Sequence, residues 1–318
     1  MIEVVFLGTG SATPSLVRHH PAMALRKQGR IFLFDCGEST QHQLIRAKWS
    51  LNKIEYIFIS HLHGDHIYGL PGLLSTMSLN NREKPLTLYG PPGIEKFISA
   101  TQPHKEFNLA FLSIVECPPG RRVIELPHTM VIMAPLKHSI LSFGFRIQDE
   151  DKPGFFDIAQ AKRLGIPPGP LYGKLQKGQS IVHQGNVITP DMVLGPTRTG
   201  LSVTFLGDTI PCRNSLALAK KTDLLVHEGT YLETDNDIAA RYLHSTFRNA
   251  AETARRAEAD KLVITHIGAK YNAKELEGEW RSMLQIFPNT ILARDLLKLT
   301  LAYKDREQAE PAKTTAGR

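Results

Sequence analysis

The sequence contains few cysteines, and their arrangement argues against a disulfide framework. Only 3 of its 318 residues are cysteine, namely Cys36, Cys117 and Cys212. An odd number of widely spaced cysteines is typical of a reducing compartment, so we predict a cytoplasmic protein. None of the three has a second Cys or a His beside it, which argues against a thiolate metal site.

Long hydrophobic runs are also missing. No apolar stretch approaches the roughly 20 residues that a membrane helix needs, so we expect no membrane partner. Residues 1–7 lack the basic start and small-residue cleavage site of a signal peptide, and we expect them to begin a first strand. Because 42% of the residues are hydrophobic, the chain can bury a substantial core in one large domain or two small ones.

Acidic residues are outnumbered by basic ones. The chain carries 38 Lys and Arg against 31 Asp and Glu, which gives a formal net charge of +7. The isoelectric point is near 9.2. This balance favours an anionic partner, most commonly nucleic acid, although a merely basic soluble protein remains the alternative.

Short apolar, β-rich runs alternate with helical patterns along most of the chain. Strands are predicted at residues 2–7, 22–26, 30–35, 54–59, 86–89, 111–116, 129–134, 141–147, 201–206, 223–227, 261–265 and 296–303. Helices are predicted at residues 39–48, 67–79, 93–100, 213–221, 246–259 and 273–286. Strands in both halves with helices between them predict an α/β (α+β) fold of two packed sheets covered by helices.

Residues 149–198 interrupt this pattern with many prolines and glycines. Only one short helix, at residues 157–164, is predicted there, and the prolines prevent the segment from joining a central sheet. A long insert of this kind is usually functional or disordered, although a plain surface loop is the alternative. Its basic side chains make it a candidate for anion binding: Lys152, Lys162, Arg163, Lys174, Lys177 and Arg198. The polar tail from Lys304 lacks periodicity and is predicted to be disordered.

One six-residue segment has the composition of a metal site. It reads His61-Leu62-His63-Gly64-Asp65-His66 and follows the apolar run at residues 54–60. His61 and His63 alternate, so an extended backbone directs both to one side, and Asp65 and His66 then offer a second pair of ligands. This arrangement suits two neighbouring metals better than one closed structural site. The alternative is a loop of solvated histidines before a helix.

Three other predicted strands end in a residue that can bind a metal. These residues are His138, Asp208 and His266. Each alone is more often a cap or a surface residue, but together with the first segment they supply seven ligands. That number suits two metals that share a carboxylate, with nitrogen-rich ligation favouring zinc and leaving manganese or iron as alternatives.

The His61–His66 segment is similar to an HxHxDH signature, and with it the chain resembles the metallo-β-lactamase superfamily. Six further motifs narrow the resemblance: Phe6-Leu7-Gly8-Thr9-Gly10-Ser11-Ala12-Thr13-Pro14, Phe34-Asp35-Cys36-Gly37-Glu38, Phe58-Ile59-Ser60-His61, Gly165-Ile166-Pro167-Pro168-Gly169-Pro170-Leu171-Tyr172, His227-Glu228-Gly229-Thr230 and His244-Ser245-Thr246. With these motifs the chain resembles the ribonuclease Z family of tRNA 3′-end endonucleases. The resemblance extends to about residue 303. It does not extend to the family's P-x-K-x-R-N loop, which discriminates the CCA end and which here reads Pro14-Ser15-Leu16-Val17-Arg18-His19.

The resemblance implies a metallo-β-lactamase-like αβ/βα sandwich of two mixed sheets. Residues 1–303 would form one domain, interrupted by a protruding tRNA-binding arm at residues 152–197 and followed by a disordered tail at 304–318. Within the arm it implies RNA-binding residues, namely Lys162, Arg163, Gly169, Pro170, Lys174 and Lys177. It also implies a homodimer in which the arm of one subunit serves the active site of the other.

The resemblance further implies two zinc ions and a division of roles in the site. One zinc would be held by His61, His63 and His138, and the other by Asp65, His66 and His266, with Asp208 bridging. The implied activity is zinc-dependent cleavage of tRNA precursors 3′ of the discriminator nucleotide, which removes the trailer and leaves a 3′-hydroxyl. Asp65 would orient or deprotonate the attacking water, and His244, held by Glu228, would protonate the leaving oxygen. The alternatives are a small-molecule phosphodiesterase or other hydrolase of the same superfamily, and an inactive RNA-binding protein of the same fold.

Overall fold

The protein is described by a computed structural model that covers residues 1–101 and 108–303. The predicted disorder of residues 304–318 lies outside the described residues. The described part of the chain forms two compact units, with Leu126–Met130 and Gln148–Gly200 in unit 2 and the other described residues in unit 1.

Two seven-stranded sheets make up most of unit 1. The first sheet has the order β16 (Lys298–Leu301), β1 (Ile2–Gly8), β2 (Ala22–Lys27), β3 (Arg30–Phe34), β4 (Ile54–Phe58), β5 (Leu86–Gly90) and β6 (Leu112–Glu116). The second has the order β15 (Thr290–Leu292), β14 (Leu262–Thr265), β13 (Leu224–Glu228), β12 (Ser202–Leu206), β9 (Ser142–Asp149), β8 (Thr129–Leu136) and β7 (Arg122–Leu126). Strands β3 to β6 are parallel, and so are β12 to β15.

The two sheets pack against each other through buried aromatic side chains. The rings of Phe34 and Phe58 from the first sheet contact Phe145 of the second sheet, with centroids 5.9 Å and 5.5 Å away. Phe34 also lies 5.7 Å from Phe205. All four side chains are buried, so water is excluded from the interface between the sheets. The predicted arrangement of two packed sheets is therefore confirmed.

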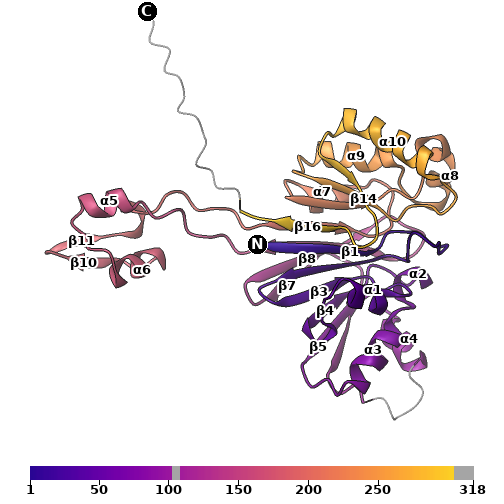
Figure 1. Ribbon diagram of the computed structural model, residues 1–318, viewed down its shortest axis with the longest axis horizontal. Helices are drawn as coiled ribbons and strands as arrows, with labels where there is room; N and C mark the ends of the chain where they lie inside the picture. Colours follow the sequence, from indigo (N-terminus) through magenta and orange to yellow (C-terminus); the bar gives the residue numbers. More distant parts are fainter. Residues whose placement is uncertain (102–107, 304–318) are drawn as a thin grey trace, which may run out of the picture. The chain divides into compact units, whose positions relative to one another are not determined.

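Helices cover the outer face of each sheet (Figure 1). The first sheet is covered by α1 (Thr40–Arg46), α3 (Leu70–Leu79) and α4 (Ile94–Thr101), which bury Leu44, Leu73 and Ile98 against it. The second is covered by α7 (Arg213–Ala219), α9 (Phe247–Arg256) and α10 (Ala273–Ile286), which bury Leu218, Ala251 and Met283. No helix in the described residues is long and apolar enough to cross a bilayer.

Every strand and helix predicted from the sequence is present, but some elements were missed. The predicted helix at 67–79 is two helices, α2 (Gly64–Ile67) and α3, so Asp65 and His66 lie on a short helix. Besides α2 and three elements of unit 2 described below, the elements that were not predicted are β7, β15, α8 (Asn236–Tyr242) and three 3₁₀ turns at Leu51–Lys53, Pro190–Met192 and Glu233–Asp235.

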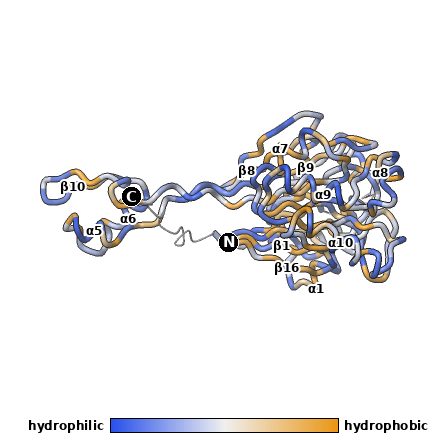
Figure 2. Tube along the Cα trace, turned by 90° about the horizontal axis from the view of Figure 1, so that it is seen from above, coloured by the Kyte–Doolittle hydropathy of each residue, from blue (hydrophilic) through white to orange (hydrophobic). Residues whose placement is uncertain are grey.

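Unit 2 has more regular structure than the sequence suggested. The expected helix is α5 (Ile158–Arg163), but α6 (Pro170–Gln176) and a hairpin of β10 (Ile181–His183) and β11 (Asn186–Ile188) are also present. The prediction of a single helix was wrong because proline is tolerated at the start of a helix, where α6 uses Pro170. The unit has its own small core of Ala161, Ile166, Leu175, Ile181, Ile188 and Val193. Figure 2 shows hydrophobic residues recurring within its helices and hairpin.

Candidate metal centre

The predicted metal ligands follow the ends of strands from both sheets. His61 and His63 come shortly after β4, and Asp65 and His66 lie on α2. His138, Asp208 and His266 follow β8, β12 and β14. Because the carboxyl ends of these strands meet, the structure brings all seven predicted side chains together in unit 1.

One group of ligand atoms consists of three histidines and a carboxylate. His63 Nδ1 lies 3.0 Å from His61 Nε2 and 3.3 Å from His138 Nε2. Asp208 Oδ2 lies 3.7 Å from His61 Nε2. The candidate ligand atoms of these four residues all lie within 4.8 Å of one another, which is compatible with binding a single metal ion.

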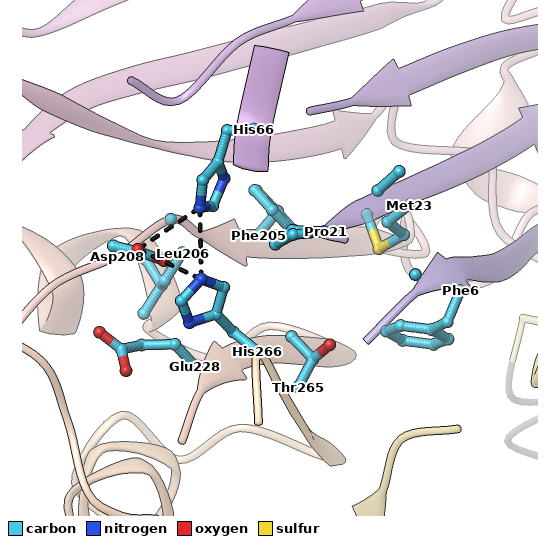
Figure 3. A pocket seen from close by; sticks show the side chains of 13 residues that line it. Phe6, Pro21, Met23, His66, Phe205, Leu206, Asp208, Glu228, Thr265 and His266 are labelled. Carbon is cyan, nitrogen blue, oxygen red and sulfur yellow. Dashed lines mark hydrogen bonds and ion pairs between the residues drawn. The ribbon is translucent and has the colours of Figure 1, made fainter. Parts of the chain in front are cut away.

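A second group lies on the other side of Asp208 and contains Asp65, His66 and His266. Asp65 Oδ2 lies 3.5 Å from His66 Nε2 and 3.4 Å from His266 Nε2. Asp208 Oδ2 lies 3.4 Å and 3.3 Å from the same two nitrogens, as Figure 3 shows for His66 and His266. One oxygen of Asp208 thus faces both groups, as a bridging carboxylate would.

The far nitrogens of the histidines are hydrogen-bonded, and these bonds determine which ring nitrogen is free. His66 Nδ1 donates to Asp35 Oδ2 at 2.7 Å. His266 Nδ1 lies 2.7 Å from Thr230 Oγ1. The Thr230 hydroxyl donates its own hydrogen to Glu228, so its oxygen accepts from His266 Nδ1. His138 Nδ1 donates to the carbonyl of Leu243 at 3.1 Å. Each of these rings therefore presents Nε2 as a bare lone pair, as a metal ligand must.

Asp35 determines the tautomer of one histidine ligand in each of the two groups. Its Oδ1 accepts from Ser60 N at 2.7 Å, and its Oδ2 accepts from Ser60 Oγ at 2.9 Å. Because the Ser60 hydroxyl donates to this carboxylate, its oxygen must accept from His61 Nδ1, which lies 2.9 Å away. A carboxylate has no hydrogen to donate, so Asp35 fixes the tautomers of both His61 and His66.

The donor set fits a metal cation. The bare Nε2 atoms of His66 and His266 lie 3.3 Å apart, where two lone pairs repel each other unless a cation or a proton lies between them. Burial lowers the pKa of His61 well below 6.5, which keeps its ring neutral and able to bind a metal. Burial also lowers the pKa of His66, but the carboxylates of Asp208 and Asp35 raise it well above its usual value, so this side of the site attracts positive charge. We conclude that the cluster is a metal-binding site.

His244 and Glu228 form a pair beside the metal ligands. His244 Nδ1 lies 2.9 Å from Glu228 Oε1, and Glu228 also accepts from Thr209 N at 2.9 Å and from Thr230 Oγ1 at 2.6 Å. Burial acts to lower the pKa of His244, but the Glu228 carboxylate outweighs it and raises the pKa to about 9. His244 also lies within reach of Asp208 and His266. Its Nδ1 is the atom that lies 3.9 Å from Asp208 Oδ2, and this nitrogen is already hydrogen-bonded to Glu228, so it is not free to bind a metal there.

An open cleft of about 900 Å³ gives access to the cluster. His63, Asp65, Asp208, His244 and His266 line it, together with Tyr68, Tyr231 and Lys270 from the rim. Behind His66 and His266 lies only a small apolar cavity of about 10 Å³, lined by Phe6, Met23, Phe205 and Leu206 (Figure 3). A space that small holds at most about one water molecule, so it cannot admit a substrate, whereas the cleft can.

The predicted RNA-binding residues all lie in unit 2, where they are solvent-exposed. Lys162 and Arg163 form the last turn of α5, and Lys174 and Lys177 lie at the end of α6. Gly169 precedes α6 with φ = 149°, a conformation that favours glycine, and Pro170 is the first residue of the helix. These residues take no part in the metal cluster.

Two residues that hydrogen-bond to the histidine ligands, Asp35 and Thr230, were given no role in the prediction from the sequence. Asp35 directly follows the buried strand β3 and has φ = 54°, so it shares the strand-end position that identified His138 and Asp208. Thr230 lies in the segment His227-Glu228-Gly229-Thr230, where Glu228 alone received a role. A systematic search of strand ends would have found Asp35, whereas Thr230 has no comparable local signal.

Two packed sheets with a His/Asp cluster at the strand ends define a metal-binding protein of the metallo-β-lactamase fold. The short form of human tRNase Z superposes with a TM-score of 0.70 and 28% identity over 94% of this chain and 99% of its own. The Bacillus subtilis metallo-β-lactamase fold protein YhfI has a TM-score of 0.68 at 16% identity, covering 94% of this chain and 100% of its own. The second likeness concerns the fold alone.

Sequence comparison gives the family. A Ribonuclease Z from Bacillus licheniformis is 41% identical over 92% of this chain and 97% of its own length. A Ribonuclease Z from Methanothermobacter thermautotrophicus is 41% identical over 96% of this chain and 98% of its own length. The chain belongs to the ribonuclease Z family. A family profile described as Anti-Pycsar protein Apyc1 also matches residues 2–101, which include the first metal segment but less than half of the chain.

Proposed function

We propose that this chain is a zinc-dependent endoribonuclease that cleaves tRNA precursors 3′ of the discriminator nucleotide. Cleavage removes the 3′ trailer and leaves a 3′-hydroxyl on the tRNA. The observation that carries the proposal is the cluster of seven ligands at the base of an open cleft, in a chain that matches proteins named Ribonuclease Z along most of its length.

Two zinc ions are the cofactors that suit this donor set. His61, His63 and His138 would hold one ion, Asp65, His66 and His266 would hold the other, and Asp208 would contact both. Nitrogen-rich ligation with a few carboxylates favours zinc, although manganese or iron can use the same donors. When bound, the ions would lower the pKa of a water molecule and neutralise charge on the phosphoryl oxygens.

The chain's own residues supply orientation and proton transfer. Asp65 lines the cleft and is positioned to orient the attacking water through its carboxylate. His244 lines the same cleft and holds its Nδ1 on Glu228, which leaves Nε2 to donate a proton to the departing 3′-oxygen. The raised pKa of about 9 keeps His244 protonated at neutral pH, as a general acid must be.

Residues 152–197 would serve as an arm that binds the tRNA body. The support for this role is an exposed set of basic residues, Lys162, Arg163, Lys174 and Lys177, on a segment that has its own small core. Such residues bind phosphates without reading sequence. We further propose that the protein is a homodimer in which one subunit's arm serves the other's cleft. If so, mixing arm-deleted subunits with Asp65→Ala subunits should restore part of the activity.

The test is cleavage of an end-labelled tRNA precursor, with and without a chelator, and with mapping of both new ends. We expect a single cut 3′ of the discriminator, a 3′-hydroxyl on the tRNA, and loss of cleavage when the metal is removed. Hydrolysis of small aryl phosphodiesters without precursor cleavage would instead favour a small-molecule hydrolase. Tight precursor binding without any hydrolysis would favour an RNA-binding protein of the same fold.

A further inference from the structure

Tyr68 is an exposed aromatic residue beside the metal centre that the proposed chemistry does not use. It follows α2 directly and lines the cleft together with His63 and Asp65. Tyr68 is 59% exposed, whereas Phe34 and Phe58 of the first sheet are fully buried. An exposed ring at the entrance of a nuclease cleft matters because every nucleobase has a flat face that can stack on it.

The ring of Tyr68 is held in place before any substrate arrives. Its backbone N donates to Gly64 O at 2.9 Å, and the ring lies directly over Gly64. A Cβ atom at Gly64 would lie 2.2 Å from Tyr68 Cε2, so the ring can adopt this position only because residue 64 is glycine. The ring also stacks on Phe97, with centroids 6.3 Å apart and planes at 27°. A ligand that stacks on Tyr68 therefore meets a preorganised surface.

A second pocket adjoins the cleft at this residue. Its volume is about 260 Å³, and Tyr68 lines both it and the cleft. The other lining residues lie at the start of α1 and of α3, namely Glu38, Ser39, Thr40, Gln41, His42, Gly69 and Gly72. The pocket is slightly smaller than those that bind drug-sized molecules, roughly 300–1,000 Å³, which suits a single planar base.

The walls of this pocket offer groups that can bind the edge of a base. Gln41 Oε1 accepts from Thr76 Oγ1 at 2.9 Å, which orients the side-chain amide and leaves its NH₂ group to donate. Gly72 lies beside this amide, since a Cβ atom built on it would be in ordinary van der Waals contact with Gln41 Nε2, at 3.4 Å. His42 is exposed beside it.

We propose that Tyr68 and this pocket form a nucleobase subsite for a nucleotide that flanks the scissile phosphate. The base would stack on the Tyr68 ring and direct its edge toward Gln41 and His42. Tyr68 lies three residues after Asp65, so a base held here would position the neighbouring phosphate over the metal ligands. The inference rests on the proposed function, since a small-molecule substrate has no flanking base.

The experiment tests whether the Tyr68 ring contacts one particular base of the substrate. Wild type, Tyr68→Leu and Tyr68→Phe are compared on an intact tRNA precursor and on two precursors with one abasic nucleotide, either just 5′ or just 3′ of the cleavage site. Base–aromatic stacking of about 1–3 kcal/mol corresponds to a loss of about 5- to 150-fold in kcat/KM for Tyr68→Leu on the intact substrate. Tyr68→Phe, which keeps the stacking surface, should stay within about threefold of wild type.

The abasic substrates decide the inference. Wild type and Tyr68→Leu should cleave one of them at similar, reduced rates, and that substrate identifies the base that binds here. The control is Tyr242→Leu, which removes a ring of similar exposure, 56%, that lines neither the cleft nor the pocket. If Tyr68→Leu loses activity equally on all three precursors, or on none, the subsite is refuted.

A binding measurement separates this inference from the proposed function. A short single-stranded RNA with 2-aminopurine at the identified position, or at each position in turn, is titrated into Asp65→Ala protein with and without the Tyr68→Leu change. Quenching of the fluorophore that depends on Tyr68 supports the subsite even if wild type fails to cut tRNA precursors, a failure that would overturn the proposed function alone. Quenching that is unchanged by Tyr68→Leu would overturn the subsite while leaving the proposed function intact.

Discussion

Replacing Asp35 by asparagine changes a single acceptor atom into a donor, and we expect this to weaken both metal groups. The native carboxylate is fully buried and accepts hydrogen bonds from Ser60 N, Ser60 Oγ and His66 Nδ1, at 2.7, 2.9 and 2.7 Å. Asparagine has nearly the same shape, so packing should be preserved. The change therefore tests the direction of the hydrogen bonds rather than the filling of space.

The asparagine side chain of this variant could adopt two orientations, and each is unfavourable. With its NH₂ toward His66 and Ser60 Oγ, His66 Nδ1 must become an acceptor, and the proton moves to Nε2, which then cannot bind a metal. The Ser60 hydroxyl then also reverses, and His61 is driven to the same wrong tautomer through the 2.9 Å contact. With its NH₂ toward Ser60 N, two donors face each other at about the 2.7 Å of the native bond, which costs roughly 1–3 kcal/mol.

The expected result is a fall in metal affinity of about 10- to 100-fold, the usual effect of losing a group that orients a histidine ligand. Affinity is measured by competition with a chromophoric chelator, and thermal unfolding of the metal-free protein checks the fold. Asp295→Asn is the matched control, because Asp295 Oδ2 accepts from His19 Nδ1 at 2.7 Å, outside the metal cluster. If Asp35→Asn binds metal as tightly as Asp295→Asn and wild type, the control of tautomers by Asp35 is wrong.

Three other changes test the remaining roles. His244→Ala should reduce precursor cleavage by about 10²- to 10⁴-fold, with metal content retained. The same change should reduce the hydrolysis of an aryl phosphodiester much less, because a phenolate leaves without protonation. Equal losses on both substrates would contradict a general-acid role. Residues 153–197 can be replaced by a short turn, because Lys152 and Arg198 already exchange two backbone hydrogen bonds at 2.8 Å. This replacement should flatten the salt dependence of tRNA binding and leave the hydrolysis of an aryl phosphodiester unchanged. An unchanged salt dependence would argue that the segment does not bind RNA. Phe58→Ala should lower the free energy of unfolding by about 3–5 kcal/mol, because its ring fills the space between the sheets, and denaturant titration would expose a smaller loss.

The sequence pointed to the seven side chains that the structure brings together, because each one follows a buried strand. A carboxylate or imidazole after an apolar run is a local pattern, and parallel strands then bring such ends together without further information. The sandwich was predicted for a related reason, since the alternation of strands and helices limits the possible layers. The pairing of His244 with Glu228 was also anticipated, although only through the resemblance to a family.

Long-range and short elements could not be predicted in this way. Asp35 is recognisable as a strand-end residue, but its pairing with His66 is not, because the hydrogen bond joins residues 31 positions apart. Strand β15 has three residues, Thr290–Leu292, too few to give a periodic pattern. The helix α6 was not predicted because it begins with Pro170 and has glycines nearby, which are residues that usually end helices. Its stability depends on contacts such as that of Leu175 with the core of unit 2.

The pairing of β16 with β1 places the last described strand of the chain beside the first. During synthesis on the ribosome, β1 therefore has an open edge until residues 298–301 emerge, and that edge is available for wrong pairing. Asp295, close to β16, also accepts from Thr9 at 2.7 Å and so ties the two ends of this sheet together. A nascent or truncated chain that lacks this strand would leave the edge of the sheet exposed, which gives chaperones and proteases a simple way to distinguish unfinished enzyme from finished enzyme.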